Sequence, residues 1–326
     1  MFGVDLPTIW FVIIAFLFAG YFLLEGFDFG VGMLLPLAGK DESRRAAMVR
    51  TIGPVWDGNE VWLITAGGAL FAAFPAWYAD MFSGYYLPLF LILAALIVRV
   101  VGLEWRSKVD TARWRSWCDA GIIIGSWAPP ILWGVAMGNL IRGVPDNAGA
   151  VYPLFNLFGI LGAAAFVTVF LVHGITFLRL KTAGALRNEL ARYVLAPTVA
   201  AVVLGGGWVV WMQLSYGKTW TWIATVVVLA GMIIAAVAAR AQRDGIAFVA
   251  TSAAVLAMSV AIFGSLFPRL WPGLDVYSAA SSHYTLVILT WAAAIGAPAV
   301  MAYQGWTYWV FRKRVTAEPV AADAAY

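Results

Sequence analysis

Nine long apolar segments constrain the fold of this chain more than any other feature of its sequence. Their approximate bounds are residues 8–37, 57–75, 82–104, 118–140, 154–178, 193–214, 219–239, 246–267 and 284–311. A membrane-spanning helix needs about 20 mostly apolar residues, because lipid offers no partner to an unpaired backbone group. The 326 residues are 63% hydrophobic and 12% charged, whereas soluble domains have about 25% charged residues. We therefore expect an all-α, polytopic membrane protein with nine transmembrane helices.

The Lys and Arg residues predict how these helices are oriented. Most of the 21 fall in one set of loops, at residues 40–50, 106–115, 179–192, 240–243 and 312–314. The opposite loops contain only Arg142, Lys218 and Arg269. Because basic loops stay in the cytoplasm, we expect the N-terminus outside, the C-terminus in the cytoplasm and an odd number of spans.

The sequence predicts one domain and a short tail. Residues 1–314 are expected to form a single transmembrane helical domain, and the Ala-rich residues 315–326 a flexible cytoplasmic tail. No Lys or Arg precedes the first apolar run, so we expect that run to remain as the first span rather than to be cleaved. The modest net charge of +4 does not indicate a nucleic-acid partner.

Two carboxyl groups stand at the start of the second apolar segment. Asp57 and Glu60 are three residues apart and so share one face of a helix. The following residues 61–74 carry no charge. Carboxylates in this position are costly unless water or a partner group reaches them, which makes this segment the strongest functional indication from the residues alone.

Further charged residues lie near the same, cytoplasmic, level. Glu25 and Asp28 fall in the first span, Arg99 in the third span and Glu104 at its end. Buried charges must be paired or hydrated. A cluster of this kind can pass protons inward or bind an anionic or quinone head group. It is explained equally well as a set of salt bridges that clamps three helices together, and the spacing leaves both interpretations open.

The residue types that bind metals are scarce. His173 and His283 are the only two histidines and are expected on opposite sides of the membrane, so they cannot hold one heme or metal together. The single cysteine, Cys118, excludes an intrachain disulfide and a thiolate cluster. We expect no metal site in this chain, and we interpret His173 as a hydrogen-bonded packing or proton-relay residue.

Longer motifs are spread along the chain from the first span to the ninth. They are Gly26-Phe-Asp-Phe-Gly-Val-Gly-Met33, Trp56-Asp-Gly-Asn-Glu-Val-Trp-Leu-Ile-Thr-Ala-Gly-Gly-Ala-Leu-Phe-Ala-Ala-Phe-Pro75, Arg99-Val-Val-Gly-Leu-Glu-Trp-Arg-Ser-Lys108, Gly125-Ser-Trp-Ala-Pro-Pro130, Gly138-Asn-Leu140 and Ala280-Ser-Ser-His-Tyr-Thr-Leu286. In this order they resemble subunit II of the bacterial cytochrome bd quinol oxidases. The long segment that begins at Trp56 is the most specific of them.

The resemblance implies a nine-helix subunit of the bacterial cytoplasmic membrane, built from two four-helix bundles and one peripheral helix. Its partner would be a similarly folded subunit I, which in that family carries two b-type hemes, one d-type heme and the quinol-oxidising loop. The complex would oxidise quinol and reduce dioxygen to water with cytoplasmic protons, building a proton gradient without pumping. A small single-span subunit and bound lipid or quinone are compatible with the resemblance.

The resemblance also assigns roles to the charged residues. Asp57 and Trp56 match the family's Trp-Asp pair at the subunit interface and are expected to line a proton pathway, together with Glu60, Asp28 and Glu25. Arg99, Glu104 and His173 are expected in a polar cluster at the interface, and no residue is expected to be directly catalytic.

Two alternatives to this role remain. In one, the chain is a structural scaffold without a conducting role. In the other, it is a proton-coupled secondary transporter. Transporters usually show two matching halves, and nothing in spans six to eight mirrors the carboxylates of the first three spans.

Overall fold

The chain folds almost entirely into helices. The computed structural model describes residues 5–144 and 152–317. Up to residue 142 the helices are α1 (Leu6–Ala38), α2 (Glu42–Ile52), α3 (Trp56–Ala73), α4 (Pro75–Gly84), α5 (Tyr86–Trp105) and α6 (Ala112–Arg142). From residue 152 the elements are η1 (Tyr152–Leu154), α7 (Leu157–Lys181), α8 (Gly184–Leu190), η2 (Ala191–Tyr193), α9 (Leu195–Ala200), the π-helical η3 (Ala201–Gly205), α10 (Gly206–Tyr216), η4 (Thr219–Thr221), α11 (Trp222–Arg240), α12 (Asp244–Leu266), the hairpin strands β1 (Arg269–Trp271) and β2 (Leu274–Asp275), and α13 (His283–Val310).

Eight helical segments within the described residues are long and apolar enough to cross a bilayer. They are α1, α5, α6, α7, the run Gly184–Tyr216, the run Thr219–Arg240, α12 and α13. Each corresponds to one of the predicted spans, so the expected all-α membrane fold is confirmed. The remaining predicted span, 57–75, forms α3, which has 18 residues. Its first turn is polar, and it is therefore too weakly apolar to belong to this group.

A separate helix lies between the second and third predicted spans. α3 ends at Ala73, and Pro75 is the first residue of α4. Proline suits that position because the N–H it lacks would have no helical partner there. The third predicted span therefore begins at Tyr86, as α5, and not at residue 82.

α1 is the central helix of the molecule and contacts α3, α6, α7, α12 and α13. Its approach to α7 depends on two glycines that meet backbone to backbone. A Cβ atom on Gly30 would lie 2.2 Å from the carbonyl oxygen of Phe170, and one on Gly174 would lie 2.4 Å from Gly30 Cα. Small residues at such crossings let helices in a membrane pack closely.

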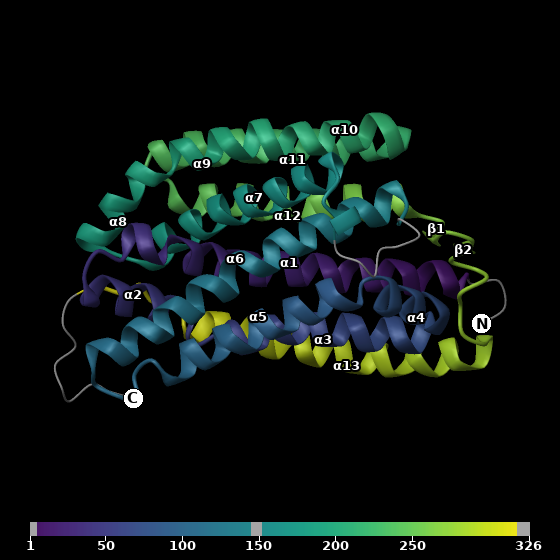
Figure 1. The fold of residues 1–326 in the computed structure, drawn as a ribbon, viewed down its shortest axis with the longest axis horizontal. Helices are drawn as coiled ribbons and strands as arrows, with labels where there is room; N and C mark the ends of the chain where they lie inside the picture. Colours follow the sequence, from purple (N-terminus) through teal and green to yellow (C-terminus); the bar gives the residue numbers. More distant parts are fainter. Residues whose placement is uncertain (1–4, 145–151, 318–326) are drawn as a thin grey trace.

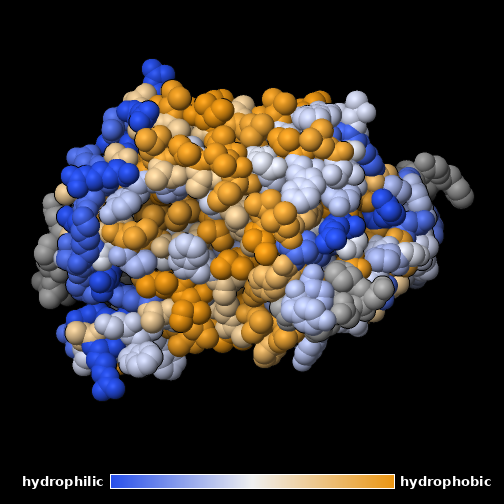
Figure 2. Space-filling view, turned by 45° about the horizontal axis from the view of Figure 1, so that its top comes forward, coloured by the Kyte–Doolittle hydropathy of each residue, from blue (hydrophilic) through white to orange (hydrophobic). Residues whose placement is uncertain are grey.

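The surface of the molecule fits a membrane protein. An apolar belt lies between hydrophilic ends, and the most hydrophilic residues gather at the end where α2, α8 and the last turn of α13 lie (Figures 1 and 2). α1 begins and α13 ends at opposite ends of the bundle (Figure 1). α13 is the most exposed of the long helices, with Leu286 as its one buried residue.

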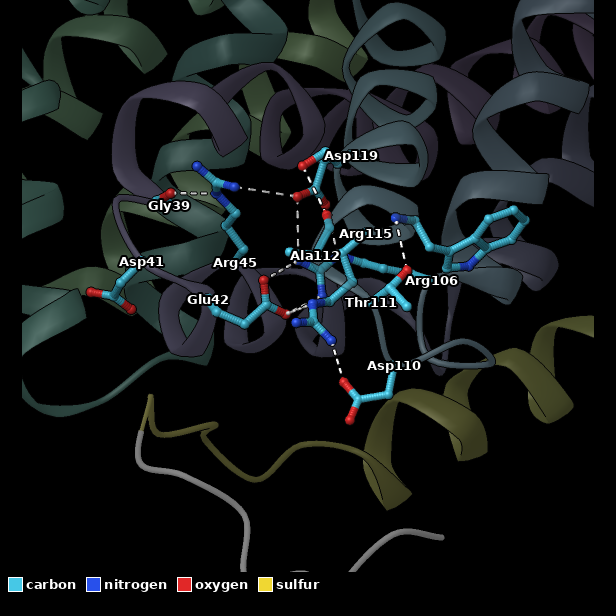
Figure 3. Close-up of polar contacts among 12 residues, drawn as sticks. Gly39, Asp41, Glu42, Arg45, Arg106, Asp110, Thr111, Ala112, Arg115 and Asp119 are labelled. Atoms are coloured by element: carbon cyan, nitrogen blue, oxygen red, sulfur yellow. Dashed lines mark hydrogen bonds and ion pairs between the residues drawn. The ribbon is translucent and has the colours of Figure 1, made fainter.

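One charged cluster ties α2 to the end of α5 and to the start of α6 (Figure 3). Arg106 Nη1 donates to Glu42 Oε1 at 2.8 Å, and Arg106 Nε donates to Asp119 Oδ1 at 2.6 Å. Arg115 and Arg45 lie 3.5 Å and 3.6 Å from Glu42 and Asp119, respectively. Burial by itself would lower the pKa of Arg106, but hydrogen bonds to Asp119 and Glu42 raise it above its usual range. Arg115 also pairs with Asp110, so three arginines meet three acids and the cluster is a structural clamp.

The first residue of the predicted tail is paired with the end of α7. Val315 N donates to the carbonyl oxygen of Lys181 at 2.7 Å, and Ala183 N donates to that of Val315 at 3.1 Å. Thr182 and Val315 thus form a parallel bridge. Residues 318–326 of the predicted tail lie outside the described residues.

Candidate functional site

Three charged side chains lie together in the interior, where none has exposed surface. Glu25 and Asp28 come from α1 and Arg99 from α5. Arg99 Nη1 donates to Glu25 Oε1, and Arg99 Nη2 lies 3.9 Å from Asp28 Oδ2. The guanidinium also stands 4.9 Å over the ring of Phe29. We call Glu25, Asp28 and Arg99 the buried charge cluster.

The buried charge cluster contains two carboxyl groups for one guanidinium. A buried charge without a partner is strongly unfavourable, so the cluster can hold a proton on one of its carboxyl groups. Among the described residues, Glu25 Oε2 and Asp28 Oδ1 have no hydrogen-bond partner. The cluster therefore has both a site for a proton and free oxygen atoms that can accept it.

Asn59 on α3 connects the buried charge cluster to α13. Asn59 Nδ2 donates to Asp28 Oδ2 at 2.8 Å. Asn59 Oδ1 accepts from Tyr308 Oη at 2.7 Å and from Gln304 Nε2 at 3.1 Å. Gln304 in turn accepts from Trp62 Nε1 at 3.0 Å. A continuous hydrogen-bonded chain thus runs from α1 through α3 to α13.

Asp57 lies outside this chain but beside it. Its side chain is exposed and lines a groove of about 120 Å³ between α3 and α13, which we call the α3–α13 groove. Gln304 and Tyr308 line the same groove. Asn59 follows Asp57 by two residues, roughly 200° around a helix, which explains why one side chain faces the groove and the other faces α1.

Trp56 and Glu104 form a separate surface pair. Trp56 Nε1 donates to Glu104 Oε1 at 3.2 Å, which joins the start of α3 to the end of α5. The sequence predicted that the charged residues of the first three spans share one cluster. The structure instead separates Asp57, Trp56 and Glu104 from the buried charge cluster, because they occupy the exposed faces of α3 and α5.

Glu60 is half-buried and faces a second, larger cavity. This cavity of about 430 Å³ lies between α3, α4 and α5, and we call it the α3–α5 cavity. Its walls are apolar and aromatic, including Phe18, Tyr78 and Trp133, and Glu60 is the one ionisable acid among the residues that line it.

His173 is buried on α7 with both ring nitrogens occupied. Nε2 lies 3.0 Å from the carbonyl oxygen of Leu23, so it carries the proton and donates. Nδ1 lies 2.8 Å from the hydroxyl of Thr251, and the ring is stacked on Phe248 at 5.0 Å. His173 thus joins α7 to α1 and α12, and it makes no contact with the buried charge cluster. This geometry fits the packing interpretation of this residue.

Three residues of the hydrogen-bonded chain were not predicted from the sequence. Asn59 lies inside the most specific motif, between Asp57 and Glu60, and its position beside these two carboxylates was an available signal. Gln304 and Tyr308 are four residues apart in the ninth predicted span and therefore share one helix face. Neither could be placed opposite Asn59 without knowing which face of α13 meets α3.

A second buried ion pair lies outside this region. Asp244 at the start of α12 accepts from Arg179 Nε at 3.0 Å and from Arg187 Nε at 2.6 Å. Arg179 also donates to the carbonyl oxygen of Ala239 at 3.0 Å. Arg179 Nη1 has no hydrogen-bond partner among the described residues, but the other contacts join α7, α8 and α12.

These features define a class: a multi-pass helical membrane protein that keeps a protonatable charge cluster inside its bundle. The family model for cytochrome bd terminal oxidase subunit II matches residues 6–311. The chain belongs to that family, as the motifs predicted, and it is therefore a subunit of a terminal oxidase in the bacterial inner membrane.

Individual relatives agree with this assignment. Subunit 2 of the cytochrome bd ubiquinol oxidase of Bacillus subtilis is 39% identical over 330 residues, covering 96% of this chain and 97% of the relative. Subunit 2 of the cytochrome bd-I ubiquinol oxidase of Escherichia coli K12 is 34% identical, covering 97% and 96%. In a solved bd oxidase structure from Geobacillus thermodenitrificans, one chain has a similar fold, with a TM-score of 0.71 at 17% identity, covering 94% of this chain and 99% of that chain.

Proposed function

We propose that this chain pairs with a similarly folded subunit I in a complex that oxidises quinol and reduces dioxygen to water. The support is membership of the subunit II family and the names of the relatives, which are ubiquinol oxidase subunits. The proton-coupled transporter is disfavoured by the same membership.

We also propose that the two b-type hemes and the d-type heme lie in subunit I. The described residues fit a heme poorly. Both nitrogens of His173 are engaged by Leu23 and Thr251, and His283 is exposed at the first residue of α13. The described residues also contain no group of three His, Cys, Asp or Glu side chains that could hold a metal.

For the membrane topology, we propose nine spans in two four-helix bundles plus one peripheral helix, with the N-terminus outside. α3, the second of these spans along the chain, is added to the eight apolar segments described above. α3 packs against the spanning helix α1. A helix can cross a membrane despite its lower hydropathy when the polar groups of its first turn are paired with groups on neighbouring helices. The distribution of Lys and Arg supports a cytoplasmic location for the end with α2 and α8.

Within the complex, we propose that this subunit leads cytoplasmic protons from Asp57 to the buried charge cluster. The observation that carries the proposal is the hydrogen-bonded chain from Asp28 through Asn59 to Tyr308 and Gln304, which line the α3–α13 groove with Asp57. Asp57 takes a proton from water at the exposed mouth of the groove. The groove then delivers it toward the free Oδ1 of Asp28.

Each residue of this route has a separate task. Arg99 keeps the buried charge cluster from accumulating two uncompensated negative charges, so that one added proton brings it to neutrality. Asn59 orients the Asp28 carboxylate by donating to Oδ2, which leaves Oδ1 free. Glu60, the residue after Asn59, is the proposed exit, because it lines the α3–α5 cavity.

The test is Asp57→Asn in the purified complex, with Asp80→Asn on α4 as the matched control. Asp57→Asn removes the titrating group and keeps the side-chain size, so we expect quinol-driven oxygen consumption to fall about tenfold or more, toward the roughly 10²- to 10⁴-fold typical of lost proton-transfer groups. Heme absorbance should stay unchanged. Asp80 is exposed and lies outside the route, so Asp80→Asn should leave turnover intact.

Two other results would exclude a proton role for Asp57. Unchanged turnover in Asp57→Asn would show that protons bypass this residue. Loss of heme with the subunit still folded and assembled would show that Asp57 supports the interface structurally, as the scaffold hypothesis holds.

A further inference from the structure

A third cavity lies at the end of the bundle where α13 finishes. Its volume is about 340 Å³, and we call it the α7–α13 cavity. The walls are formed by the end of α2, the residue before α3, the last turn of α7, the start of α12, the last turn of α13 and the segment that follows it. Tyr308 lines both this cavity and the α3–α13 groove, but none of the acids of the proposed proton route lines this cavity.

The inner wall of the α7–α13 cavity, away from its rim, is apolar and rigid. Phe177 and Phe248 line it, and Phe177 is stacked on Phe27 with ring centroids 4.0 Å apart. Leu180 and the exposed Phe311 extend the apolar lining to the surface. Such a wall fits an acyl chain.

The rim of the α7–α13 cavity carries only positive charge. Lys181, Arg312 and Arg314 line it, and no carboxylate does. In contrast, Arg106, Arg179 and Arg44 at the same end of the molecule are each paired with an acid.

Among the described residues, the hydrogen bonds of the rim residues go to backbone carbonyl oxygens and not to acids. Lys181 donates to the carbonyl oxygens of Phe311 and Lys313, and Arg312 Nη1 donates to that of Trp309 at 2.6 Å. Within residues 5–144 and 152–317, none of the three rim residues forms an ion pair with an acid.

The rim is also held in place before any ligand arrives. The parallel bridge between Thr182 and Val315 joins the residue after Lys181 to the residue after Arg314. Arg50 Nη2 donates to the carbonyl oxygen of Thr316 at 3.1 Å, which fixes the same segment to α2. Preorganised cations lose less freedom when they bind an anion.

We propose that the α7–α13 cavity binds an anionic phospholipid, with its phosphate between Lys181, Arg312 and Arg314 and the start of one acyl chain against Phe177 and Phe248. Arginine matches phosphate oxygens with paired hydrogen bonds, and basic pockets between membrane helices suit such head groups. A quinone ring is uncharged and would leave the three cations unmatched. Charge complementarity therefore selects the phospholipid.

The experiment uses the intact oxidase complex, delipidated in mild detergent and studied by native mass spectrometry. Palmitoyl-oleoyl-phosphatidylglycerol is the anionic probe, and the phosphatidylcholine with the same chains is the comparator without net charge. The test variant is Arg312→Gln with Arg314→Gln. The matched control is Arg113→Gln with Arg240→Gln, which removes the same charge from exposed positions outside the cavity.

We expect wild type and control to retain one phosphatidylglycerol molecule with at least tenfold higher affinity than the test variant shows. Phosphatidylcholine should bind weakly to all three. If the double variant assembles poorly, Arg314→Gln alone serves as the test variant with a smaller expected loss of affinity, because the Arg314 side chain forms no hydrogen bond or ion pair among the described residues. Heme absorbance confirms that each complex is intact.

Three outcomes would overturn the proposal. Equal phosphatidylglycerol affinity in the test and control variants would show that the rim does not bind the lipid. Equal binding of phosphatidylcholine and phosphatidylglycerol by wild type would show that charge has no role. Displacement of the lipid by a short-chain quinone or by inorganic phosphate would assign the cavity to a different ligand.

Discussion

Asn59 shows why a neutral amide is suited to the centre of the hydrogen-bonded chain. Its amide nitrogen donates to Asp28, and its oxygen accepts from Tyr308 and Gln304. A carboxylate at this position would add a third acid beside a single arginine. A leucine of similar size would leave buried polar groups on both sides without partners, which costs about 1–3 kcal/mol for each group. Asparagine is a residue that donates on one side and accepts on the other.

Removing the Tyr308 hydroxyl tests whether Tyr308 relays protons or only packs against its neighbours. Tyr308→Phe removes only the group that donates to Asn59 at 2.7 Å. If protons reach Asp28 through this chain, we expect turnover to fall several-fold and the solvent deuterium isotope effect on oxygen consumption to increase, because proton delivery then limits the rate. The measurement is oxygen uptake by the purified complex in H₂O and in D₂O.

Tyr303→Phe is the matched control for this variant. Tyr303 lines the same α3–α13 groove, and its hydroxyl makes no hydrogen bond within the described residues. It should retain full turnover and the wild-type isotope effect. Identical behaviour of the two variants would argue against a relay through Tyr308.

At the scale of helices, α13 and α7 are attached to α1 in different ways. α13 buries little of its surface and relies on side-chain hydrogen bonds, including Trp10 Nε1 to Thr290 Oγ1 at 3.0 Å and the bonds of Gln304 and Tyr308. α7 instead contacts α1 through the Gly30–Gly174 crossing. Attachment by a few polar contacts lets α13 adjust, whereas a backbone crossing tolerates almost no change of size.

Gly174→Ala tests the crossing between α1 and α7. The added Cβ would lie 2.4 Å from Gly30 Cα, so the helices must separate. Overpacking of this kind destabilises proteins by about 1–3 kcal/mol, and we expect a lower unfolding temperature, followed by loss of heme absorbance on heating. Gly296→Ala on α13 is the control, because a Cβ there meets nothing within 4 Å. Equal unfolding temperatures for the two variants would mean that the crossing is less tight than described.

The sequence predicted the lengths of the helices better than their faces. Apolar runs define spans because lipid requires every backbone group to be paired within a helix, and eight predicted spans appear with nearly the expected bounds. The same runs do not specify rotation about the helix axis. The spacing of Asp57 and Asn59 turns them to different sides of α3, but only tertiary packing decides that Asp57 faces the groove and Asn59 faces Asp28. The residue types of the candidate site were predictable. Which of them lie in the buried charge cluster and which lie at the surface was not.

At the scale of the whole molecule, both candidate sites lie at the end where the basic residues are concentrated. In the acid–base clusters at the end with α2 and α8 each arginine is paired with an acid, whereas no acid is among the residues that line the cationic α7–α13 cavity at that end. The mouth of the α3–α13 groove is at the start of α3, and α2 leads directly into it. Proton uptake and lipid binding would therefore occur on the same, cytoplasmic, side of the membrane.

The orientation and the spanning role of α3 can be tested together by cysteine labelling. Arg50 on α2 and Asp80 on α4 flank α3, and both are exposed. In a Cys118→Ser background, a membrane-impermeant maleimide applied to intact spheroplasts should label Asp80→Cys at once and Arg50→Cys only after the membrane is opened. Oxygen consumption of each variant confirms that the oxidase is assembled. Labelling of both positions from one side would mean that α3 does not cross, because two residues on either side of a span cannot share a compartment. The reverse pattern would invert the topology and place the Asp57 groove outside, where it could not take protons from the cytoplasm.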